Sequence, residues 1–442
     1  MECIKKSTML QQFDLLIQNG HVLGETGWLS PGYIIVDAGI ILEVKNGHPA
    51  PEVISSARKV LDASGMAVIP GLTNAHTHLC QTFMRGLANG RTLLSWLKEL
   101  IWPLQAGMDK EDLVLAVTLG LVENLHSGVT HVVNHHKITR TKAFTQAVCQ
   151  AVQNVGIRCT VVRAWSDRGS GAENQLSLLD ELEELFSTCH DAGPLIKLAN
   201  GPLTPWRATA ETLQRTHALA QRFHSYTHIH VAETQDEVQM TLEETGLRPI
   251  AWLDSLGILD EDCQIVHAVW VDEQEVNLLR ERKSPVIHCP VSNAVLGSGI
   301  APLHLFINNG IQVLLGTDGS ASNDTQDLFE TMKMALCLSR VKTLDPTVLS
   351  PRQILKMALA GKSICQHQPA DLALIELGTS HTAPVHDIDS ALVLCARSSD
   401  IHTVIVDGKI VLENHHVTVL DEKLLIQECC QSAEKLRKRA GI

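Results

Sequence analysis

The stretch Val68–Leu79 reads VIPGLTNAHTHL and joins a short apolar run to two histidines separated by one residue. Residues Gly71–Ala75 have the length and composition of a buried strand. His76 and His78 follow that strand. Because alternate residues of an extended chain share a face, both imidazoles can point to one ion. This stretch therefore predicts a strand that ends in part of a metal site.

Seven more apolar runs of strand length follow along the chain, and segments with helical periodicity separate them. The helical segments include Lys110–His126, Thr141–Val155, Ala208–Arg222 and Gln235–Glu244. The predicted strands are Gly71–Ala75, Val129–Asn134, Arg158–Arg163, Ile196–Asn200, Thr227–Val231, Gln264–His267, Pro285–His288 and Gln312–Gly316. Since strand–helix alternation is typical of a parallel sheet, eight such units predict an α/β fold, a (β/α)₈ TIM barrel over residues 70–362.

Short strands and turns flank the predicted barrel on both sides. Runs such as Leu15–Ile17 and Tyr33–Val36 stand between Gly-containing turns, which indicates small antiparallel strands. Behind the barrel we predict strands at Leu372–Ile375, Ala391–Leu394 and Thr403–Val406, a hairpin turn at Asp407–Lys409 and a polar helix at Glu422–Ala440. We expect residues 1–69 and 363–442 to form one discontinuous β-sandwich domain beside the barrel.

Length and composition place the chain among globular proteins. Its 442 residues suffice for one large barrel and a smaller satellite domain. A hydrophobic content of 45%, a charged content of 19% and a mean hydropathy of +0.06 indicate a sizeable core. The formal net charge is −13, and no Lys/Arg run of the kind that forms a basic face is seen, which argues against nucleic-acid binding. The acidic balance fits small neutral or cationic molecules as substrates.

The sequence also indicates a compartment. Met1–Leu16 contains neither a continuous apolar segment nor a small-residue cleavage site, so we expect no signal peptide. No run of eighteen apolar residues exists, so we expect no membrane span. The 12 cysteines include no CxxC pair, which without a secretory signal indicates reduced thiols. We therefore expect a cytoplasmic protein.

Residues that ligate metals stand at four of the predicted strand ends, where (β/α)₈ barrels carry their function. Any one of them could be a hydrogen-bonded histidine or a capping aspartate, but polar ligands at four strand ends of one barrel are hard to assign to packing. The joint pattern therefore predicts a metal site. The residues are His76 and His78 after the first strand, His230 and then Glu233 at the fifth, His267 at the sixth and Asp318 at the eighth.

These residues lie in motifs that resemble those of the amidohydrolase superfamily, in its mononuclear aminohydrolase branch. The motifs are VIPGLTNAHTHL (Val68–Leu79), HVAET (His230–Thr234), VHAVW (Val266–Trp270), HCPVSN (His288–Asn293), SGIAP (Ser298–Pro302) and GTDGSASND (Gly316–Asp324). They span most of the chain in the family's order, and Ser390–Val411 looks like the family's returning β-sandwich. The resemblance implies a metal-dependent aminohydrolase that removes an amino group from a nitrogen heterocycle and releases ammonia.

The resemblance also implies a ligand set and a single ion. His76, His78, His230 and Asp318 would hold one divalent metal per chain, Zn²⁺ first and Fe²⁺ as the alternative, because imidazole and carboxylate suit either. A binuclear site usually needs a bridging, carbamylated lysine at the end of the fourth strand. Lys197 lies near the start of that strand, so we expect one ion.

Three residues take catalytic roles by the same resemblance. The ion lowers the pKa of bound water to about 7 and yields hydroxide. Asp318 takes the proton of this water. Glu233 donates a proton to the ring nitrogen and then passes one to the departing ammonia. His267 steers the water and stabilises the tetrahedral intermediate.

Two subgroups of the branch compete for the substrate. The segment Arg85–Pro103, which includes Trp96 as a candidate substrate contact, looks like that of methylthioadenosine and S-adenosylhomocysteine deaminases. Nucleoside deaminases of this type usually carry a histidine two residues after the Gly of a GPH-type motif. Leu203 occupies that place and cannot hydrogen-bond a purine.

The other subgroup comprises 8-oxoguanine, isoxanthopterin and triazine aminohydrolases. Gln81 and the doubled His135 and His136 resemble this subgroup, and Gln81 offers a donor and an acceptor to an amide-like ring edge. Arg163 could contact a carbonyl or carboxylate, or form a salt bridge at the rim. Lys137 replaces an aromatic residue of the pattern. We favour a free base-like purine, pterin or triazine, bound by a homo-oligomer.

Other readings stay open at this stage. A nucleoside deaminase, a dechlorinating triazine hydrolase or a ring-opening amidohydrolase would use related residues, and a binding protein with a relict site would keep only the fold. Between Gly361 and Leu372 the chain also lacks roughly a helix and a turn of the family pattern. That gap leaves the ligand set intact and affects the packing of the last barrel helix.

Overall fold

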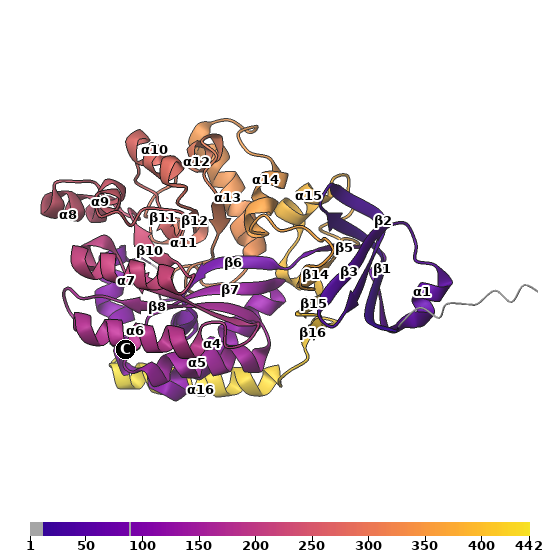
Figure 1. Cartoon of the computed structure of the whole chain (residues 1–442), viewed down its shortest axis with the longest axis horizontal. Coiled ribbons are helices and arrows are strands. Elements are labelled where there is room, and N and C mark those ends of the chain that lie inside the picture. Colours follow the sequence, from indigo (N-terminus) through magenta and orange to yellow (C-terminus); the bar gives the residue numbers. More distant parts are fainter. Residues whose placement is uncertain (1–11, 88–89) are drawn as a thin grey trace, which may run out of the picture.

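The computed structural model describes residues 12–87 and 90–442. A barrel with its surrounding helices makes up the larger part, and a mixed sheet lies beside it (Figure 1). Two parts of the segments discussed above lie outside the described residues. They are residues 1–11, where we expect no signal peptide, and residues 88–89 of the Arg85–Pro103 segment. No described helix is long and apolar enough to cross a membrane.

The barrel contains all eight strands predicted from the sequence. Its strands pair in parallel and in chain order, from β6 to β13. They are β6 (Leu72–Thr77), β7 (Val129–His136), β8 (Arg158–Trp165), β9 (Ile196–Pro202), β10 (Thr227–Val231), β11 (Cys263–His267), β12 (Val286–His288) and β13 (Val313–Leu315). The prediction of a parallel eight-stranded barrel is confirmed.

Helices follow the strands and cover the outside of the barrel (Figure 1). The longer ones are α4 (Lys110–His126), α5 (Lys142–Val155), α6 (Gln175–Cys189), α7 (Ala210–Arg222), α8 (Gln235–Thr245), α10 (Glu273–Arg282), α13 (Leu328–Thr343) and α14 (Pro351–Ala358). The shorter ones are η1 (Leu79–Met84), α2 (Leu93–Trp96), η2 (Leu97–Ile101), α3 (Trp102–Gly107), η3 (Pro205–Arg207), α9 (Pro249–Ser255), α11 (Pro290–Val295) and α12 (Leu303–Asn308). All four helices named from the sequence are present.

The ends of these helices follow from local sequence. Asp109 precedes α4 and forms a capping box with Asp112, in which each side chain accepts from the other's backbone N–H. Helix α5 ends at Gly156, whose φ of +77° is a conformation that glycine adopts readily. Sequence signals at both ends therefore define the boundaries of these helices.

The first and last barrel strands meet at a seam built from side chains. Asn74 is buried, and its amide donates to Asn124 Oδ1 at 2.9 Å and Thr317 Oγ1 at 2.8 Å. Its oxygen accepts from the backbone N–H of Thr317 at 3.1 Å. At Gly316 a Cβ atom would lie 2.8 Å from His76 Cβ, so only glycine allows this approach. The seam places the residue after β13 beside the end of β6.

Both ends of the chain contribute to the second sheet. Strand β14 (Leu372–Glu376) pairs with β5 (Met66–Pro70), so the small domain is discontinuous as predicted. Its hydrogen bonds connect nine strands into one mixed sheet. The other members are β1 (Phe13–Gly24), β2 (Gly27–Asp37), β3 (Ile40–Asn46), β4 (Ala57–Asp62), β15 (Ile401–Val406), β16 (Lys409–Glu413) and β17 (His416–Val417); α1 (Pro51–Ser56) lies between β3 and β4.

Two details of this domain differ from the sequence prediction. Strands β1, β2 and β3 are antiparallel as expected, but β4 and β5 lie parallel to β1. The predicted strand Ala391–Leu394 is wrong, because these residues form the helical turn η4 (Ala391–Cys395) after α15 (Ile388–Ser390). A four-residue apolar run does not distinguish strand from helix. Asp387, whose carboxylate accepts from Ser390 N at 2.8 Å, is the helix-start signal there.

The short connection after Gly361 follows the edge of the small sheet. Ile364 is buried, and its N–H donates to the Leu23 carbonyl. His367 N donates to Ile41 O, and Ala370 N donates to Gly39 O. These hydrogen bonds lead the chain directly from α14 to β14 without a further helix.

The C-terminal helix α16 (Glu422–Ala440) lies against α3 and α4 of the barrel (Figure 1). Ser432 and Arg439 both bind the carboxylate of Asp112, and Leu436 is buried against Gly107. We propose the division 1–69, 70–362 and 363–442 for the chain, with the end of the third segment packed on the second.

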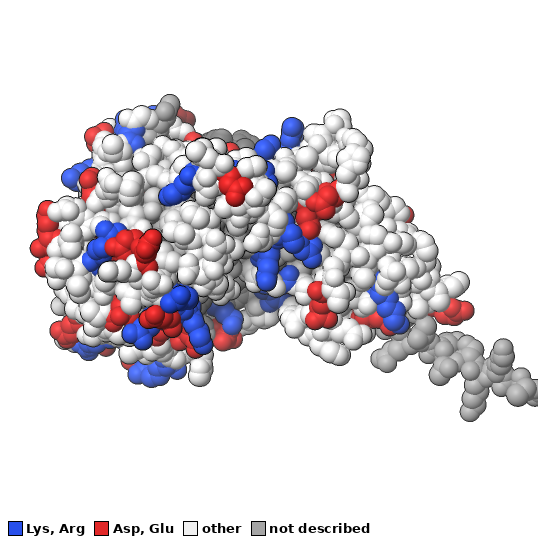
Figure 2. All heavy atoms as spheres, turned by 90° about the horizontal axis from the view of Figure 1, so that it is seen from above, with Lys and Arg blue, Asp and Glu red and all other residues white. Residues whose placement is uncertain are grey.

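Charged side chains are distributed without a dominant sign on the face shown in Figure 2. Lys and Arg residues lie among Asp and Glu residues there and form no continuous basic surface.

An ion-pair cluster joins the small domain to the base of the barrel. Arg158, at the start of β8, donates from Nε to Asp371 Oδ2 at 2.5 Å and from Nη2 to Asp407 Oδ1 at 2.8 Å. The Asp407 backbone N–H donates to Asp371 Oδ1 at 2.8 Å. The side chains of Arg158 and Asp371 are only 17% and 13% exposed. Removal of Asp371 therefore leaves a largely buried guanidinium without its main partner.

We expect Asp371→Ala to lower the free energy of the first unfolding transition in urea by roughly 2–4 kcal/mol, since it breaks a largely buried pair. The control is Glu413→Ala, which removes a more exposed ion pair with Lys59 within the small sheet. That change should cost about 1 kcal/mol or less. Equal losses for the two variants would contradict the role given to Asp371.

Candidate active site

All six residues selected as ligands or catalysts meet at the C-terminal end of the barrel. His76 and His78 lie at the end of β6, His230 in β10, and His267 at the end of β11. Glu233 follows β10 and Asp318 follows β13. A pocket of about 510 Å³ opens over them. The structure therefore brings together side chains that are up to 242 residues apart in sequence.

Three imidazole nitrogens and one carboxylate oxygen converge on a small volume. His78 Nε2 lies 3.3 Å from His230 Nε2 and 3.2 Å from Asp318 Oδ1. His76 Nε2 lies 3.4 Å from the same Asp318 oxygen. All four side chains are buried, with at most 6% of any of these residues exposed. Such a cluster has the composition of a four-ligand metal site.

The outer ring nitrogens fix the tautomers of these histidines. His78 Nδ1 lies 2.8 Å from the His135 carbonyl, and His230 Nδ1 lies 2.8 Å from the Leu203 carbonyl. A carbonyl oxygen can only accept, so both Nδ1 atoms donate and both Nε2 atoms of the neutral rings carry lone pairs. Lone pairs that face each other at 3.3 Å repel. A cation between them removes the repulsion, so the residues fit a metal ion.

The third imidazole belongs to a longer chain of hydrogen bonds. His76 Nδ1 lies 2.8 Å from His228 Nε2, and His228 Nδ1 lies 2.9 Å from Gln264 Oε1. If His228 donates to Gln264, it accepts from His76, which leaves His76 Nε2 with a free lone pair. That atom is buried without a hydrogen-bond partner in the described chain. Outer partners of this kind orient metal-binding histidines.

Burial keeps the ligand groups in the states that bind a metal. It lowers the pKa of His78 and of His230 well below the usual range, so both rings are neutral at neutral pH. Asp318 accepts from Gly319 N at 2.7 Å and from Ser292 Oγ at 2.6 Å, and both donors stabilise its carboxylate. The φ of Asp318 is +61°, an uncommon conformation that aims this carboxylate at the histidines.

Glu233 and His267 stand beside this cluster. Glu233 Oε2 lies 3.5 Å from His267 Nε2, and Glu233 Oε1 accepts from Ser298 Oγ at 2.9 Å. His267 Nδ1 lies 2.9 Å from Asn293 Oδ1, which fixes the plane of its ring. Ser298 and Asn293 belong to quoted motifs but not to the residues selected from the sequence. Both side chains hold a catalytic candidate in place.

The predicted substrate-binding residues fall into two groups. Trp96 and Leu203 line the pocket with His78, His230, Glu233, His267 and Asp318. Gln81 is buried against the Asp318–Gly319 turn, because a Cβ on Gly319 would lie 1.9 Å from Gln81 Oε1. Arg163 is 1% exposed and its Nη2 lies 2.7 Å from Glu173 and 2.9 Å from Glu181. These ion pairs favour the salt-bridge interpretation of Arg163.

The two adjacent histidines after strand two separate. His135 points into the barrel, where its ring centroid lies 4.7 Å from that of His230. His136 is buried on the opposite face of β7, since alternate residues point to opposite sides. Neither ring has a hydrogen-bond partner among the residues described. His135 could also approach a metal, because its ligand atom lies within 4.8 Å of those of His78 and His230.

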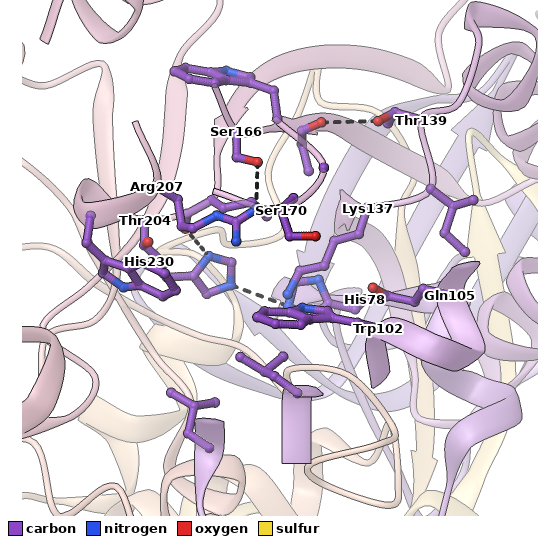
Figure 3. Close-up of a pocket in the computed structure, with 18 of the residues that line it drawn as sticks. His78, Trp102, Gln105, Lys137, Thr139, Ser166, Ser170, Thr204, Arg207 and His230 are labelled. Carbon is purple, nitrogen blue, oxygen red and sulfur yellow. Dashed lines mark hydrogen bonds between the residues drawn. The ribbon is translucent and has the colours of Figure 1, made fainter. Parts of the chain in front are cut away.

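Sequence reasoning does not single out several residues that line the pocket. Trp102 and Gln105 come from the excursion after β6, and Arg207 belongs to η3 after β9 (Figure 3). Glu237 accepts from Trp206 Nε1 at 3.2 Å and from Glu233 N at 3.1 Å. Burial and the charge of Glu233 raise the pKa of Glu237 to about 7. Arg207 follows a strand end and could be found by that rule once cations are included in the search.

Comparison with known proteins agrees with this geometry. Residues 67–411 match the amidohydrolase family, from the strand before the first histidines to the strand β16 of the small sheet. The chain belongs to the amidohydrolase family. The match covers all the residues that converge on the site.

Relatives of this amidohydrolase include deaminases. It is 33% identical to a 5'-deoxyadenosine deaminase of Methanosarcina acetivorans over 97% of this chain and 99% of the relative. It is also 33% identical to a 5-methylthioadenosine/S-adenosylhomocysteine deaminase of Pyrococcus furiosus, over 93% and 98% of the two chains. The crystal structure of an adenosine deaminase from Xanthomonas campestris with bound zinc superposes with a TM-score of 0.89 at 28% identity, covering 97% and 99%.

We expect purified protein to contain one divalent ion per chain, and His230→Ala to lose most of it, because that change removes one of four converging ligands. Elemental analysis by plasma mass spectrometry gives the metal content. The control is His416→Ala, a substitution at an exposed position on β17, which should keep the ion. Two tightly bound ions per active chain, or full metal content in His230→Ala, would contradict the single-ion assignment.

Proposed function

We propose that this amidohydrolase removes an amino group from a nitrogen heterocycle by hydrolysis and releases ammonia. The observation that supports it most directly is the clustering of His76, His78, His230 and Asp318, with the Glu233 carboxylate near them in the lining of a pocket. Hydrolytic deamination needs a Lewis acid next to a group that can exchange a proton. The relatives that are deaminases support the same reaction.

In this proposal His76, His78, His230 and Asp318 hold a single ion. Zn²⁺ is the first choice, because nitrogen and oxygen ligands suit it and the Xanthomonas relative contains zinc, and Fe²⁺ is the alternative. The bound ion supplies Lewis acidity and lowers the pKa of water to about 7. The four side chains contribute the fixed geometry and the dry surroundings.

The remaining groups handle protons. Glu233 gives a proton to the ring nitrogen next to the reacting carbon and later passes one to the departing ammonia. Its hydrogen bond with Ser298 leaves the second oxygen free to face the pocket and His267. Asp318 receives the proton of the attacking water, and Ser292 and Ser322 stabilise its charge through Oδ2. His267 orients the water.

The size of the pocket supports a substituted heterocycle. A volume of about 510 Å³ lies in the range of sites for drug-sized ligands, and four tryptophans stand along its walls. The nucleoside deaminases among the relatives match nearly the whole chain. The expectation of a free base rests mainly on one side chain, that of Leu203. In the structure the backbone carbonyl of this residue binds His230. We therefore propose an adenosine-like substrate ahead of an unsubstituted base.

We expect Glu233→Gln to keep about one metal ion per chain and to lose at least about 100-fold in ammonia release, because the amide keeps the shape but cannot shuttle a proton. His230→Ala should lose both metal and activity. Glu243→Gln, an exposed carboxylate on α8, is the control and should keep both. If Glu233→Gln retained more than about a tenth of the activity, the aminohydrolase mechanism would have to be withdrawn.

We expect methylthioadenosine and 5'-deoxyadenosine to exceed guanine, 8-oxoguanine and isoxanthopterin in kcat/KM, because a nucleoside fills more of the pocket of about 510 Å³ than a free base does. Ammonia release from the metal-loaded protein measures the ranking. The opposite order would support the interpretation that Leu203 marks an enzyme for free bases. Chloride release from a chlorotriazine tests the remaining alternative, a dechlorinating hydrolase.

A homo-oligomeric state and a location in the cytoplasm remain predictions. Sedimentation of the purified chain tests the first, and fractionation of the native cells tests the second.

A further inference from the structure

The pocket holds an arginine close to two tryptophan rings. The guanidinium carbon of Arg207 lies 5.8 Å from the ring centroid of Trp102 and 5.7 Å from that of Trp206. Figure 3 places Arg207 in the same cavity as His230 and Lys137. Aromatic faces attract a cation but leave its N–H groups free to donate in the plane of the guanidinium.

The hydrogen bonds of Arg207 do not neutralise its charge. Its Nη2 donates to Ser166 Oγ at 3.0 Å and to the Ser170 carbonyl at 2.6 Å, and both acceptors are neutral. Its Nε is buried and has no partner in the described chain. Burial lowers the pKa of Arg207 below its usual value. Arg207 forms no ion pair within residues 12–87 and 90–442.

The pocket holds two further cations that have no ion pair in the described part of the chain. Lys137 and Arg140 line the pocket, and neither forms an ion pair with a described carboxylate. The nearby Glu173 is taken by Arg163 at 2.7 Å. Arg140 donates instead to the backbone carbonyls of the Gln105–Ala106 segment. Asp318, Glu233 and Glu237 line the same pocket and partly offset the charge of Lys137. Arg207 and Arg140 instead donate to neutral groups in the described chain, and their charge favours a negative ligand near Arg207.

A purely structural role explains only part of this arrangement. Arg207 ties the loop after β8 to the wall through Ser166 and Ser170, and a Cβ on Gly169 would lie 3.2 Å from its Nη1. A neutral glutamine could make similar contacts with two neutral acceptors. A role in holding the loop explains neither the buried Nε without a partner nor the lack of a described carboxylate that pairs with Arg207.

We propose that Arg207, assisted by Lys137 and Arg140, binds a carboxylate carried by the substrate at a position remote from the amino group that is removed. Hydrogen bonds between a guanidinium and a carboxylate are strong because both groups are charged, and the contacts with Ser166 and Ser170 use only Nη2 of Arg207. This inference rests on the proposed deamination and adds the charge of the substrate.

Matched acids and esters test the charge at constant size. One pair is adenosine-5'-carboxylate and its methyl ester, in which the carboxylate stands on the sugar. The other is pterin-6-carboxylate and its methyl ester, in which it stands on the ring. For the pair that fits, we expect kcat/KM of the acid to exceed that of the ester by roughly 10- to 100-fold, as for a hydrogen bond to a charged group. The pair with the larger ratio identifies where the carboxylate lies.

Substitutions at Arg207 separate binding from support of the loop. Arg207→Gln should reduce the acid-to-ester ratio to near one, and Arg207→Lys should restore part of it, because the charge returns without the fork. The control Arg168→Gln removes a cation from the same loop, where Arg168 pairs with Glu244 outside the pocket lining. It should keep the full ratio. A loss of activity in Arg207→Gln that is equal for acid and ester would overturn the inference.

A binding measurement distinguishes this inference from the proposed function. Quenching of tryptophan fluorescence gives the Kd of each acid and ester for Glu233→Gln, which is expected to bind without turnover. Tighter binding of the acid that Arg207→Gln abolishes supports the carboxylate site even if no compound releases ammonia, which would refute only the deamination. Ammonia release with equal Kd values for acid and ester would refute only the carboxylate site.

Discussion

The active site depends on lone pairs that face one another. Hydrogen bonds from Nδ1 to the carbonyls of His135 and Leu203 leave the Nε2 atoms of His78 and His230 unprotonated, 3.3 Å apart and next to Asp318. Burial of such groups without a partner is costly, so the arrangement has to be supported by the rest of the fold. A cation converts this destabilising contact into binding energy, which explains why the site suits a metal better than any rearranged hydrogen-bond network.

The barrel supplies the rigidity that this contact needs. Asn74 ties β6 to Thr317 after β13, and Asp318 N donates to the His76 carbonyl at 2.9 Å, so two ligands at opposite ends of the barrel sequence share one backbone contact. Of the two remaining ligands, His78 is tied to β7 through the His135 carbonyl, and His230 is tied to Leu203, the residue after β9. Each ligand is therefore held by the strand that carries it and by a neighbour, which limits its freedom to relax away from the others.

The charge of the whole chain and the charge of the pocket lead to different expectations about substrate. The net charge of −13 favours neutral or cationic ligands, as long-range steering acts on total charge. Within the pocket, contacts at a few ångströms dominate, and there Arg207 meets only neutral acceptors. Specificity in a buried cavity follows the nearby groups, because the low dielectric strengthens contacts at a few ångströms while water and salt screen the distant surface charges.

Sequence periodicity by itself determined the barrel, since each strand and helix of a (β/α)₈ unit buries a face of its own and leaves a local pattern. The strand-end rule likewise located the histidines, Glu233 and Asp318, because parallel strands end at one edge. Periodicity was not enough for Ala391–Leu394, because a four-residue run is too short to distinguish a strand from a helix.

Only the tertiary structure decided which strand-end side chains face the pocket. His136 and His135 are adjacent but lie on opposite faces of β7, and Arg163 is bound by two glutamates. Arg207 lies in the cavity near its neighbour Trp206 and near Trp102, which is distant in sequence. Such choices depend on loop paths and on partners far away in sequence, which no local pattern encodes.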